Sequence, residues 1–202
     1  MMDTSPILDV LREALPGAPI AAADSTDMPS IVVDRDALID TMRTLCDDPR
    51  LQFALLVDVT AVDYLPVEPR FEVVYHLACL GAAFTTSNSP AAPARRLRVR
   101  VPLSGDSANV PTLVSVFPGA NWPEREVFDL FGIVFEGHPD LRRILMPDDW
   151  QGSPLRKDYP VQVRKDTLAW EPVQVSAQEF AENIRVARER AAKTAGPRAD
   201  RE

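Results

Sequence analysis

Residues 121–160 read NWPEREVFDLFGIVFEGHPDLRRILMPDDWQGSPLRKDYP. This stretch mixes acidic, basic, aromatic and turn residues more densely than a purely structural segment needs, so we take it as the organising element of the chain. Its first part has the punctuation of a helix. Asn121 can accept a hydrogen bond from the amide three residues on, Glu124 can bond back to it, and Gly132 can end the helix. The sequence therefore predicts a short helix between Asn121 and Gly132.

The side chains of this predicted helix divide into two faces at about 100° per residue. One face is apolar and the other polar, the first formed by Val127, Phe128, Leu130 and Phe131 and the second by Arg125, Glu126 and Asp129. Arg125 and Asp129 stand four positions apart, so they can form an ion pair on the polar face.

Glu124 does not fit this division, because it falls within the apolar face beside Phe128 and Phe131. Two interpretations follow. The favoured one is a capping acid at a helix start, where the helix dipole stabilises negative charge. The other is an acid at a buried contact, which needs a positive partner such as Arg142 or Arg143.

Beyond Gly132 the same stretch becomes irregular. Residues 133–135 are apolar but too few for more than a strand fragment, and Gly-His-Pro at 137–139 indicates a turn. Proline near the start and proline at the end predict a second short helix over 139–147. Residues 148–160 look extended, so their backbone must form hydrogen bonds with other parts of the protein.

The rest of the chain supplies the elements of one domain. Apolar spacing predicts helices over residues 6–15, 34–46 and 110–117 and strands over residues 30–33, 53–59, 71–79 and 97–103. This order of strand, helix, three strands and helices predicts an α+β fold, in which a mostly antiparallel sheet carries helices on one face. The other face would be free to meet a partner.

The last predicted strand alternates apolar residues with Arg96, Arg98 and Arg100, which gives it one buried and one basic face. We expect these arginines to be solvated or paired with cross-strand acids such as Glu72 rather than to form a ligand site.

Three parts follow from this organisation. Residues 1–136 form the α+β domain, and residues 137–163 form a motif strap that packs on the domain and on a partner. Residues 164–202 form an extended partner-binding tail with a disordered end. Trp170 and Phe180 are isolated large apolar residues in this polar tail, so we expect them to anchor it on a partner.

Composition limits the function. The 202 residues are 46% hydrophobic, enough for a core, and the net charge of -8 argues against a nucleic-acid binder. No apolar run reaches the ~18 residues of a membrane span, and the N-terminus lacks the pattern of a secretory signal. Cys46 and Cys79 are single and far apart, so this chain alone builds neither an iron–sulfur nor a zinc site. Motifs for nucleotides or an activated nucleophile are also missing, so we expect no catalytic, cofactor-binding or metal-binding residue.

The motif Glu-Arg-Glu-x-x-Asp-Leu-Phe-Gly-Ile-x-Phe-x-Gly-His-Pro-Asp-Leu-Arg-Arg-Ile-Leu from Glu124, followed by Gly-x-Pro-Leu-Arg-Lys-Asp-Tyr-Pro ending at Pro160, closely resembles the 30 kDa subunit family of respiratory complex I, whose members form its C subunit. That family includes the corresponding chloroplast subunit and relatives in membrane-bound hydrogenases. The resemblance is tight over 124–160, weak as far as Phe180, and only architectural upstream. Ser153, where many members have His, and Met146, in place of a small polar residue, depart from it.

The resemblance implies a peripheral-arm structural subunit of a proton-translocating NADH:quinone oxidoreductase (NDH-1) on the cytoplasmic side of the cell membrane. The whole complex passes electrons from NADH through FMN and iron–sulfur clusters to quinone. This subunit would be non-catalytic, would carry no cofactor, and would dock mainly on the D subunit of complex I, with subunits B and I nearby.

The family motif and the tail supply the expected interface residues, namely Glu124, Arg125, Glu126, Asp129, Phe131, Gly132, His138, Pro139, Asp140, Arg142, Arg143, Pro154, Leu155, Arg156, Lys157, Asp158, Tyr159, Trp170 and Phe180. The cations among them could pair internally with neighbouring aspartates or across the interface with carboxylates of the D subunit.

Two alternatives remain open. The chain could be the equivalent subunit of a membrane-bound hydrogenase or of a quinone reductase with another donor. It could also be a self-contained acid/base enzyme in which His138 acts with Glu124, Glu126 or Asp129.

Overall fold

The computed structural model describes residues 4–81, 94–106 and 108–160, together with 178, 182 and 184–186. The chain divides into two compact units, Met1–Pro160 and Val161–Glu202. The residues of the family motif as far as Pro160 belong to the first unit. The predicted anchors Trp170 and Phe180 lie outside the described residues.

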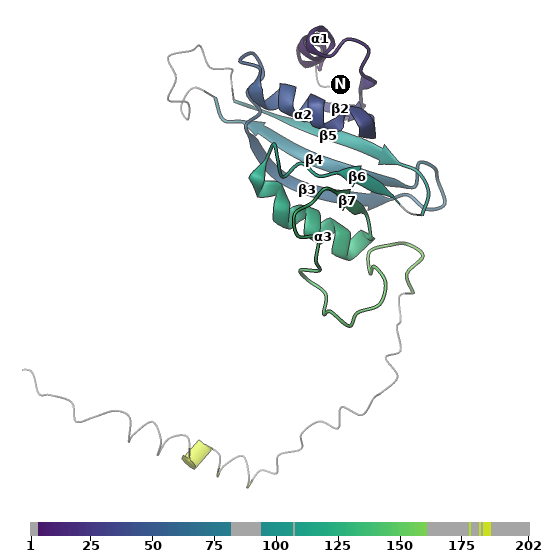
Figure 1. Ribbon diagram of the computed structural model, residues 1–202, viewed down its shortest axis with the longest axis vertical. Coiled ribbons are helices and arrows are strands. Elements are labelled where there is room, and N and C mark those ends of the chain that lie inside the picture. The colour runs from purple at the N-terminus through teal and green to yellow at the C-terminus, as the bar shows by residue number, and fades with distance from the viewer. Residues whose placement is uncertain are drawn as a thin grey trace, which may run out of the picture. The chain divides into compact units, whose positions relative to one another are not determined.

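One five-stranded sheet forms the centre of the first unit (Figure 1). Its strands are β1 (Ile20–Ala22), β2 (Ser30–Val33), β3 (Leu55–Asp63), β4 (Phe71–Cys79) and β5 (Arg95–Leu103). Their order in the sheet is β1-β2-β5-β4-β3. All neighbouring pairs are antiparallel except β2 and β5, which are parallel. The predicted strand pattern is confirmed, although β1 falls in a segment whose sequence indicates only turns.

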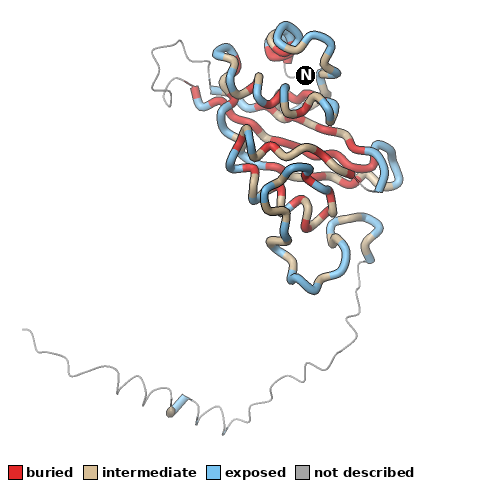
Figure 2. The backbone as a smooth tube through the Cα atoms, viewed as in Figure 1, coloured by how far each residue is buried: buried red, intermediate tan, exposed pale blue. Residues whose placement is uncertain are grey.

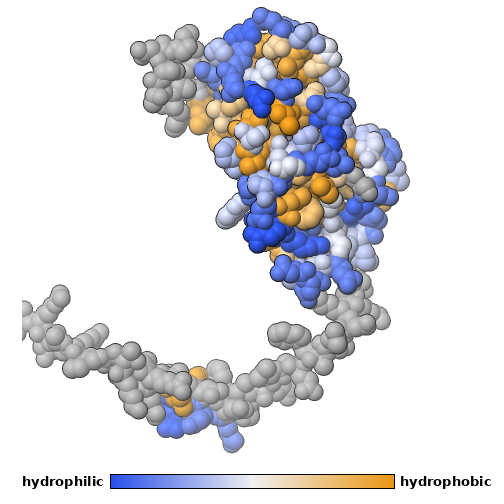
Figure 3. Space-filling model, viewed as in Figure 1, coloured by the Kyte–Doolittle hydropathy of each residue, from blue (hydrophilic) through white to orange (hydrophobic). Residues whose placement is uncertain are grey.

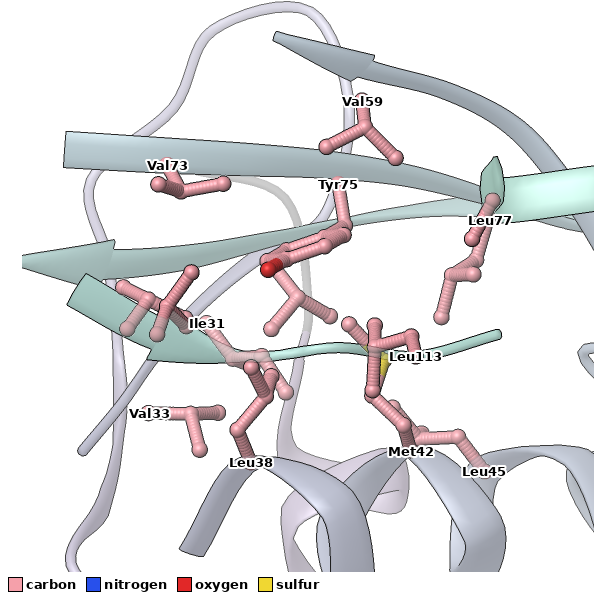
Figure 4. Packing of buried hydrophobic residues seen from close by; sticks show 14 of the residues in the cluster. Ile31, Val33, Leu38, Met42, Leu45, Val59, Val73, Tyr75, Leu77 and Leu113 are labelled. Atoms are coloured by element: carbon pink, nitrogen blue, oxygen red, sulfur yellow. The ribbon is translucent and has the colours of Figure 1, made fainter. Parts of the chain in front are cut away.

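Three helices complete the layer on the sheet, namely α1 (Ser5–Ala14), α2 (Leu38–Asp47) and α3 (Asn121–Phe131). Leu38, Met42 and Leu45 of α2 point towards Tyr75 and Leu77 of β4 (Figure 4). The buried residues of α1 and α3 belong to the same hydrophobic cluster. Most buried positions accordingly lie along the strands and on the helix faces turned to them (Figure 2). The predicted α+β class, with helices on one face of a mostly antiparallel sheet, is therefore confirmed.

The basic face of β5 also follows the expectation. Arg100 pairs with Glu72 on β4, with a distance of 2.8 Å between Nε and the carboxylate oxygen. Arg98 pairs with Asp27 at 2.8 Å and donates a hydrogen bond to His76 Nε2 at 3.3 Å. These arginines are thus held by acids and by a cross-strand imidazole.

The helix predicted over residues 110–117 is wrong. Residues Asn109–Pro111 form a strand, β6, which pairs in parallel with β7 (Val134–Glu136). Thr112 N–H continues this pairing to Glu136 O at 2.9 Å. The partner strand lies far along the chain, so local spacing carries no trace of it. The pairing places β6 and β7 on either side of α3 in the sequence and fixes where that helix begins and ends.

Gly132 ends α3 in the left-handed conformation, at φ 74°, as predicted. A Cβ at this position would approach Ser153 Oγ to 2.9 Å. Only glycine adopts this backbone conformation without strain.

We therefore expect Gly132→Ala to lower the free energy of unfolding by about 1–2 kcal/mol. Gly119→Ala is the matched control, because an added Cβ there meets nothing within 4 Å, and it should change stability by less than about 0.5 kcal/mol. Urea unfolding followed by circular dichroism measures both. Equal effects of the two substitutions would contradict the assigned helix end.

Candidate docking surface

The strap, defined here as residues 137–160, contains turns and bends but no helix or strand. The second helix predicted over residues 139–147 is therefore wrong, and Asp129 of α3 explains why. One of its carboxylate oxygens accepts the N–H groups of Ile144, Leu145 and Met146, at 3.0, 2.8 and 2.8 Å. These amides bond to a side chain, so the backbone does not continue into a helix.

Asp129 is fully buried, and Arg143 donates to its other oxygen at 2.7 Å. Burial is the largest influence on the pKa of Asp129 and raises it, but the three amides and Arg143 together outweigh burial and lower the pKa below its usual value. The predicted pair between Arg125 and Asp129 is wrong. Arg125 instead donates to the carbonyl oxygens of Arg142 and Arg143, at 3.0 and 3.1 Å. Both side chains of α3 thus fasten the first half of the strap.

Asp63, at the end of β3, fastens the last part of the strap. Its carboxylate accepts the N–H of Lys157 at 2.8 Å and pairs with Arg70 at 3.1 Å. Burial again opposes ionisation most strongly, but hydrogen bonds from Arg70 and from the amides of Leu65 and Lys157 lower the pKa of Asp63 to about 2. The hairpin between β3 and β4 is in this way joined to the strap through a buried charge.

Arg70 is the cation at the centre of this contact, and only 3% of its side chain is exposed. It also bonds to Asp106 and, at 2.9 Å, to Asp158 of the strap. The guanidinium groups of Arg70 and Arg156 lie over the Phe71 ring, 4.7 and 5.1 Å from its centroid. Cation–π contacts of this kind add to the ion pairs because the site is largely shielded from water.

Between these two attachments the strap is fixed by further contacts. Leu155 N–H donates to Leu130 O of α3 at 3.0 Å. Trp150 and Tyr159 stack with ring centroids 6.4 Å apart. The backbone hydrogen bonds that the sequence requires for an extended segment are therefore made to α3, to the β3–β4 hairpin and within the strap.

Glu124 is buried but does not cap the helix. Residue 120 occupies the capping position of α3, with no side-chain cap, so the capping interpretation is wrong. The alternative of a buried contact is correct, although its expected arginine partner is not. Glu124 accepts from Thr112 Oγ1 at 2.5 Å and from Leu113 N–H at 2.7 Å. Burial raises the pKa of Glu124 to about 7 against these two hydrogen bonds.

His138 holds the turn at the start of the strap. Its Nδ1 accepts the N–H of Asp140 at 3.0 Å, so the proton lies on Nε2, which donates to Asn121 O at 3.1 Å. Nε2 also lies 4.0 Å from a carboxylate oxygen of Glu124. Both ring nitrogens bond to backbone groups, an arrangement that fixes the turn.

The expected interface residues within the described part of the chain divide by burial. Glu124, Asp129 and Phe131 are buried; Arg125, Gly132, His138, Asp140, Arg143, Pro154, Arg156 and Tyr159 are intermediate; Glu126, Pro139, Arg142, Leu155, Lys157 and Asp158 are exposed. The motif residues are thus brought together around α3, but many of them bond inwards rather than face a partner.

The exposed apolar residues near the strap were only partly expected. Trp122 is 69% exposed, Leu145 58% and Leu155 51%. Figure 3 shows such hydrophobic residues among hydrophilic ones on the face drawn. Sequence reasoning missed Trp122 and Leu145. Trp122 could have been found, because helical spacing places it on the polar face of α3, whereas Leu145 was assigned inwards on the wrong helix.

Comparison with known proteins agrees with this geometry. Residues 31–165 match the family described as the respiratory-chain NADH dehydrogenase 30 kDa subunit. The C subunit of the NADH-quinone oxidoreductase of Roseiflexus sp. (strain RS-1) is 45% identical over 160 residues, which cover 79% of this chain and 86% of the relative. The corresponding protein of Rhodopseudomonas palustris (strain TIE-1) is 42% identical over 176 residues, covering 83% and 79%.

Two solved structures are also similar. A trypsin-resistant fragment of Nqo5 is 33% identical and covers 67% of this chain and 98% of its own, with a TM-score of 0.49. A chain of the membrane-bound sulfane sulfur reductase, an archaeal respiratory membrane complex, has a TM-score of 0.60 at 23% identity and covers 98% of this chain and 95% of its own. The second likeness is one of fold.

These matches define the class as subunits of the respiratory NADH-quinone oxidoreductases. Within it, the chain belongs to the respiratory-chain NADH dehydrogenase 30 kDa subunit family, as its motif indicates. Membership implies a membrane-associated complex that uses NADH, FMN, iron–sulfur clusters and quinone. Among the described residues, no helix is long and apolar enough to cross a membrane.

The buried carboxylate of Asp129 gives a first test of the strap attachment. Asp129→Ala removes the acceptor of three amides and the partner of Arg143, so we expect it to lower the free energy of unfolding by about 3 kcal/mol. Glu126→Ala is the control, since that residue is exposed on the same helix, and it should cost less than about 0.5 kcal/mol. Urea unfolding measures both, and a small effect of Asp129→Ala would contradict the attachment.

Glu124 predicts a pH dependence of stability. Its pKa rises from 4.5 to about 7 on folding, so the folded state binds more protons in this range. The stabilisation is complete below pH 4.5 and is lost as the pH rises to about 7. The loss is on the order of 3 kcal/mol. His76, whose pKa burial lowers, gives the opposite slope, so the comparison must be made with a variant.

Glu124→Gln keeps the acceptor for Leu113 N–H without the ionisation. We expect its unfolding free energy to lack the decline between pH 5 and 7 that the parent chain shows. Chemical unfolding at a series of pH values measures this difference. The same decline in both proteins would show that Glu124 does not carry it.

Proposed function

We propose that this chain is a non-catalytic, cofactor-free structural subunit in the peripheral arm of its complex, on the cytoplasmic side of the cell membrane. The strap would dock mainly on the D subunit, with subunits B and I nearby. The observation that carries the proposal is a strap whose backbone is fixed while Leu145 and Leu155 remain 58% and 51% exposed. A strap free to rearrange could bury these side chains, whereas a fixed strap keeps them available to a partner.

Rigid presentation of this kind favours binding. Association is weakened by the entropy of ordering loops and side chains, and a preformed surface avoids most of that cost. Apolar anchors surrounded by polar residues are typical of the energetically important centre of an interface. The residues of the family motif would then act in two groups, an inner one that fixes the strap and an outer one that meets the partner. Trp170 and Phe180 stay predicted anchors of the tail.

The choice of complex rests on the relatives. Those 42–45% identical to this chain are named as components of an NADH-quinone oxidoreductase. The fold also occurs in an archaeal complex named as a sulfane sulfur reductase, at 23% identity. We therefore favour the NADH:quinone complex over a hydrogenase or another reductase that contains an equivalent subunit.

Purification of the tagged full-length chain from mild-detergent membrane extracts tests the assignment. We expect subunits D, B and I by mass spectrometry and NADH-dependent quinone reduction in the eluate. Recovery with a hydrogenase large subunit would move the chain to a sister complex. Recovery of the chain alone, as a monodisperse protein, would refute the proposed function.

A matched pair of substitutions locates the docking surface. Leu145→Asp should lower recovery of the partner subunits roughly tenfold, because a charge replaces an apolar anchor. Val67→Asp, at an equally exposed apolar residue of the β3–β4 hairpin (61% exposed), should leave recovery within about twofold. Thermal melting of the purified variants checks that both remain folded. Equal losses for the two variants would contradict docking through the strap.

A further inference from the structure

The cations of the family motif differ in what they bind. Arg142 bonds to Asp140 through Nε and Nη2 at 2.6 and 2.7 Å. Arg143 bonds to Asp129 at 2.7 Å and to Gly152 O at 3.1 Å. The structure therefore resolves an alternative that the sequence leaves open, since both arginines pair within the chain.

The last two cations of the strap stand next to each other and behave differently. Arg156 donates to Asp158 at 3.3 Å and to Asp106 O at 3.2 Å. Lys157 is exposed, and the ion pairs and hydrogen bonds found within the described ranges of the chain include none from its ammonium group. Lys157 is thus the motif cation whose charge is not used within this part of the protein.

The nearby acids explain why Lys157 does not pair locally. Asp63, which accepts the Lys157 amide, is already paired with Arg70 at 3.1 Å. Asp158 bonds to Arg70 at 2.9 Å and to Arg156 at 3.3 Å. Arginine forms such multiple planar hydrogen bonds better than lysine, so these carboxylates are held by guanidinium groups and the ammonium group stays outside.

The backbone at this point is fixed on both sides. Leu155 N–H bonds to Leu130 O at 3.0 Å, and Lys157 N–H bonds to Asp63 at 2.8 Å. Arg156 between them turns inwards over the ring of Phe71. Leu155 and Lys157 therefore lie on the outside, two residues apart, on a segment that cannot easily turn them inwards.

We propose that Leu155 and Lys157 form a two-residue contact with a partner protein, in which the Lys157 ammonium pairs with a partner carboxylate and Leu155 enters an apolar site beside it. The contact rests on the proposed docking function and specifies its chemistry. A fixed backbone lowers the entropy lost when the lysine is ordered. A charge that faces a partner contributes to both the rate and the specificity of association.

Competitive assembly tests the contact in the intact complex. Cells produce the full-length parent chain and one variant with distinguishable tags, and the complex is isolated through another subunit. Mass spectrometry gives the ratio of the two chains in the complex, relative to their ratio in the free pool. Lys157→Gln should reduce this ratio about tenfold, the loss expected for one interface ion pair of roughly 1.4 kcal/mol.

Three further variants separate charge from packing and from general effects. Lys157→Arg keeps the charge and should incorporate within about twofold of the parent chain, whereas Lys157→Met keeps the apolar stem and should fall as far as Lys157→Gln. Arg142→Gln is the matched control, because it also removes one exposed motif charge but one that Asp140 already holds. Its ratio should stay within about twofold.

Each outcome has a definite reading. Equal incorporation of Lys157→Gln and the parent chain overturns the contact while leaving the proposed function intact. An equal loss for Arg142→Gln also overturns it, because the effect would then be one of net charge. If neither parent nor variant associates with the other subunits, the proposed function fails and the contact with it. If Lys157→Gln melts lower than the parent chain, retained incorporation of Lys157→Arg together with loss of an equally stable Lys157→Met still supports the contact, and retention by both overturns it.

Discussion

The convergence of three backbone amides and one guanidinium on the buried carboxylate of Asp129 is the interaction on which the strap depends. A buried carboxylate is tolerated only when hydrogen bonds replace the water that it loses. In this protein the strap supplies those donors, through Ile144, Leu145, Met146 and Arg143. The dependence is mutual, since the strap has no helix or strand in which to satisfy these amides. Helix and strap are therefore one folding unit.

Two carboxylates on the same helix show how the number of donors sets the ionisation state. Asp129 has four donors and a lowered pKa, whereas Glu124 has two and a pKa raised to about 7. Both lose hydration, but only Asp129 also gains a cation. Asp63 repeats the first pattern at the other end of the strap, with Arg70 as its cation. Charged attachments at both ends thus hold a segment of irregular backbone in one conformation, which leaves its exposed side chains ready for a partner.

The sequence predicts those features whose cause is local. Helix α3, its end at Gly132, the alternating strands β4 and β5 and the α+β class all follow from spacing and turn residues. The errors share a different cause. Residues 109–111 form a strand because they pair with β7, and the expected second helix is missing because distant Asp129 captures its amides. The charge pairs stayed open for the same reason, since several combinations suit the spacing and only the fold selects among them. The motif itself identified the family, although no local rule could say which of its residues turn inwards.

Native-state hydrogen exchange by NMR on the free full-length chain tests most directly whether the strap is fixed before any partner binds. The amides of Ile144, Leu145, Met146 and Lys157 are the ones that the two buried carboxylates accept. Hydrogen bonds that hold the strap closed by about 3 kcal/mol would slow their exchange by roughly a hundredfold or more relative to an unstructured chain. Exchange at the unstructured rate, in a chain whose sheet amides remain protected, would show that the strap is not preformed and would contradict the account.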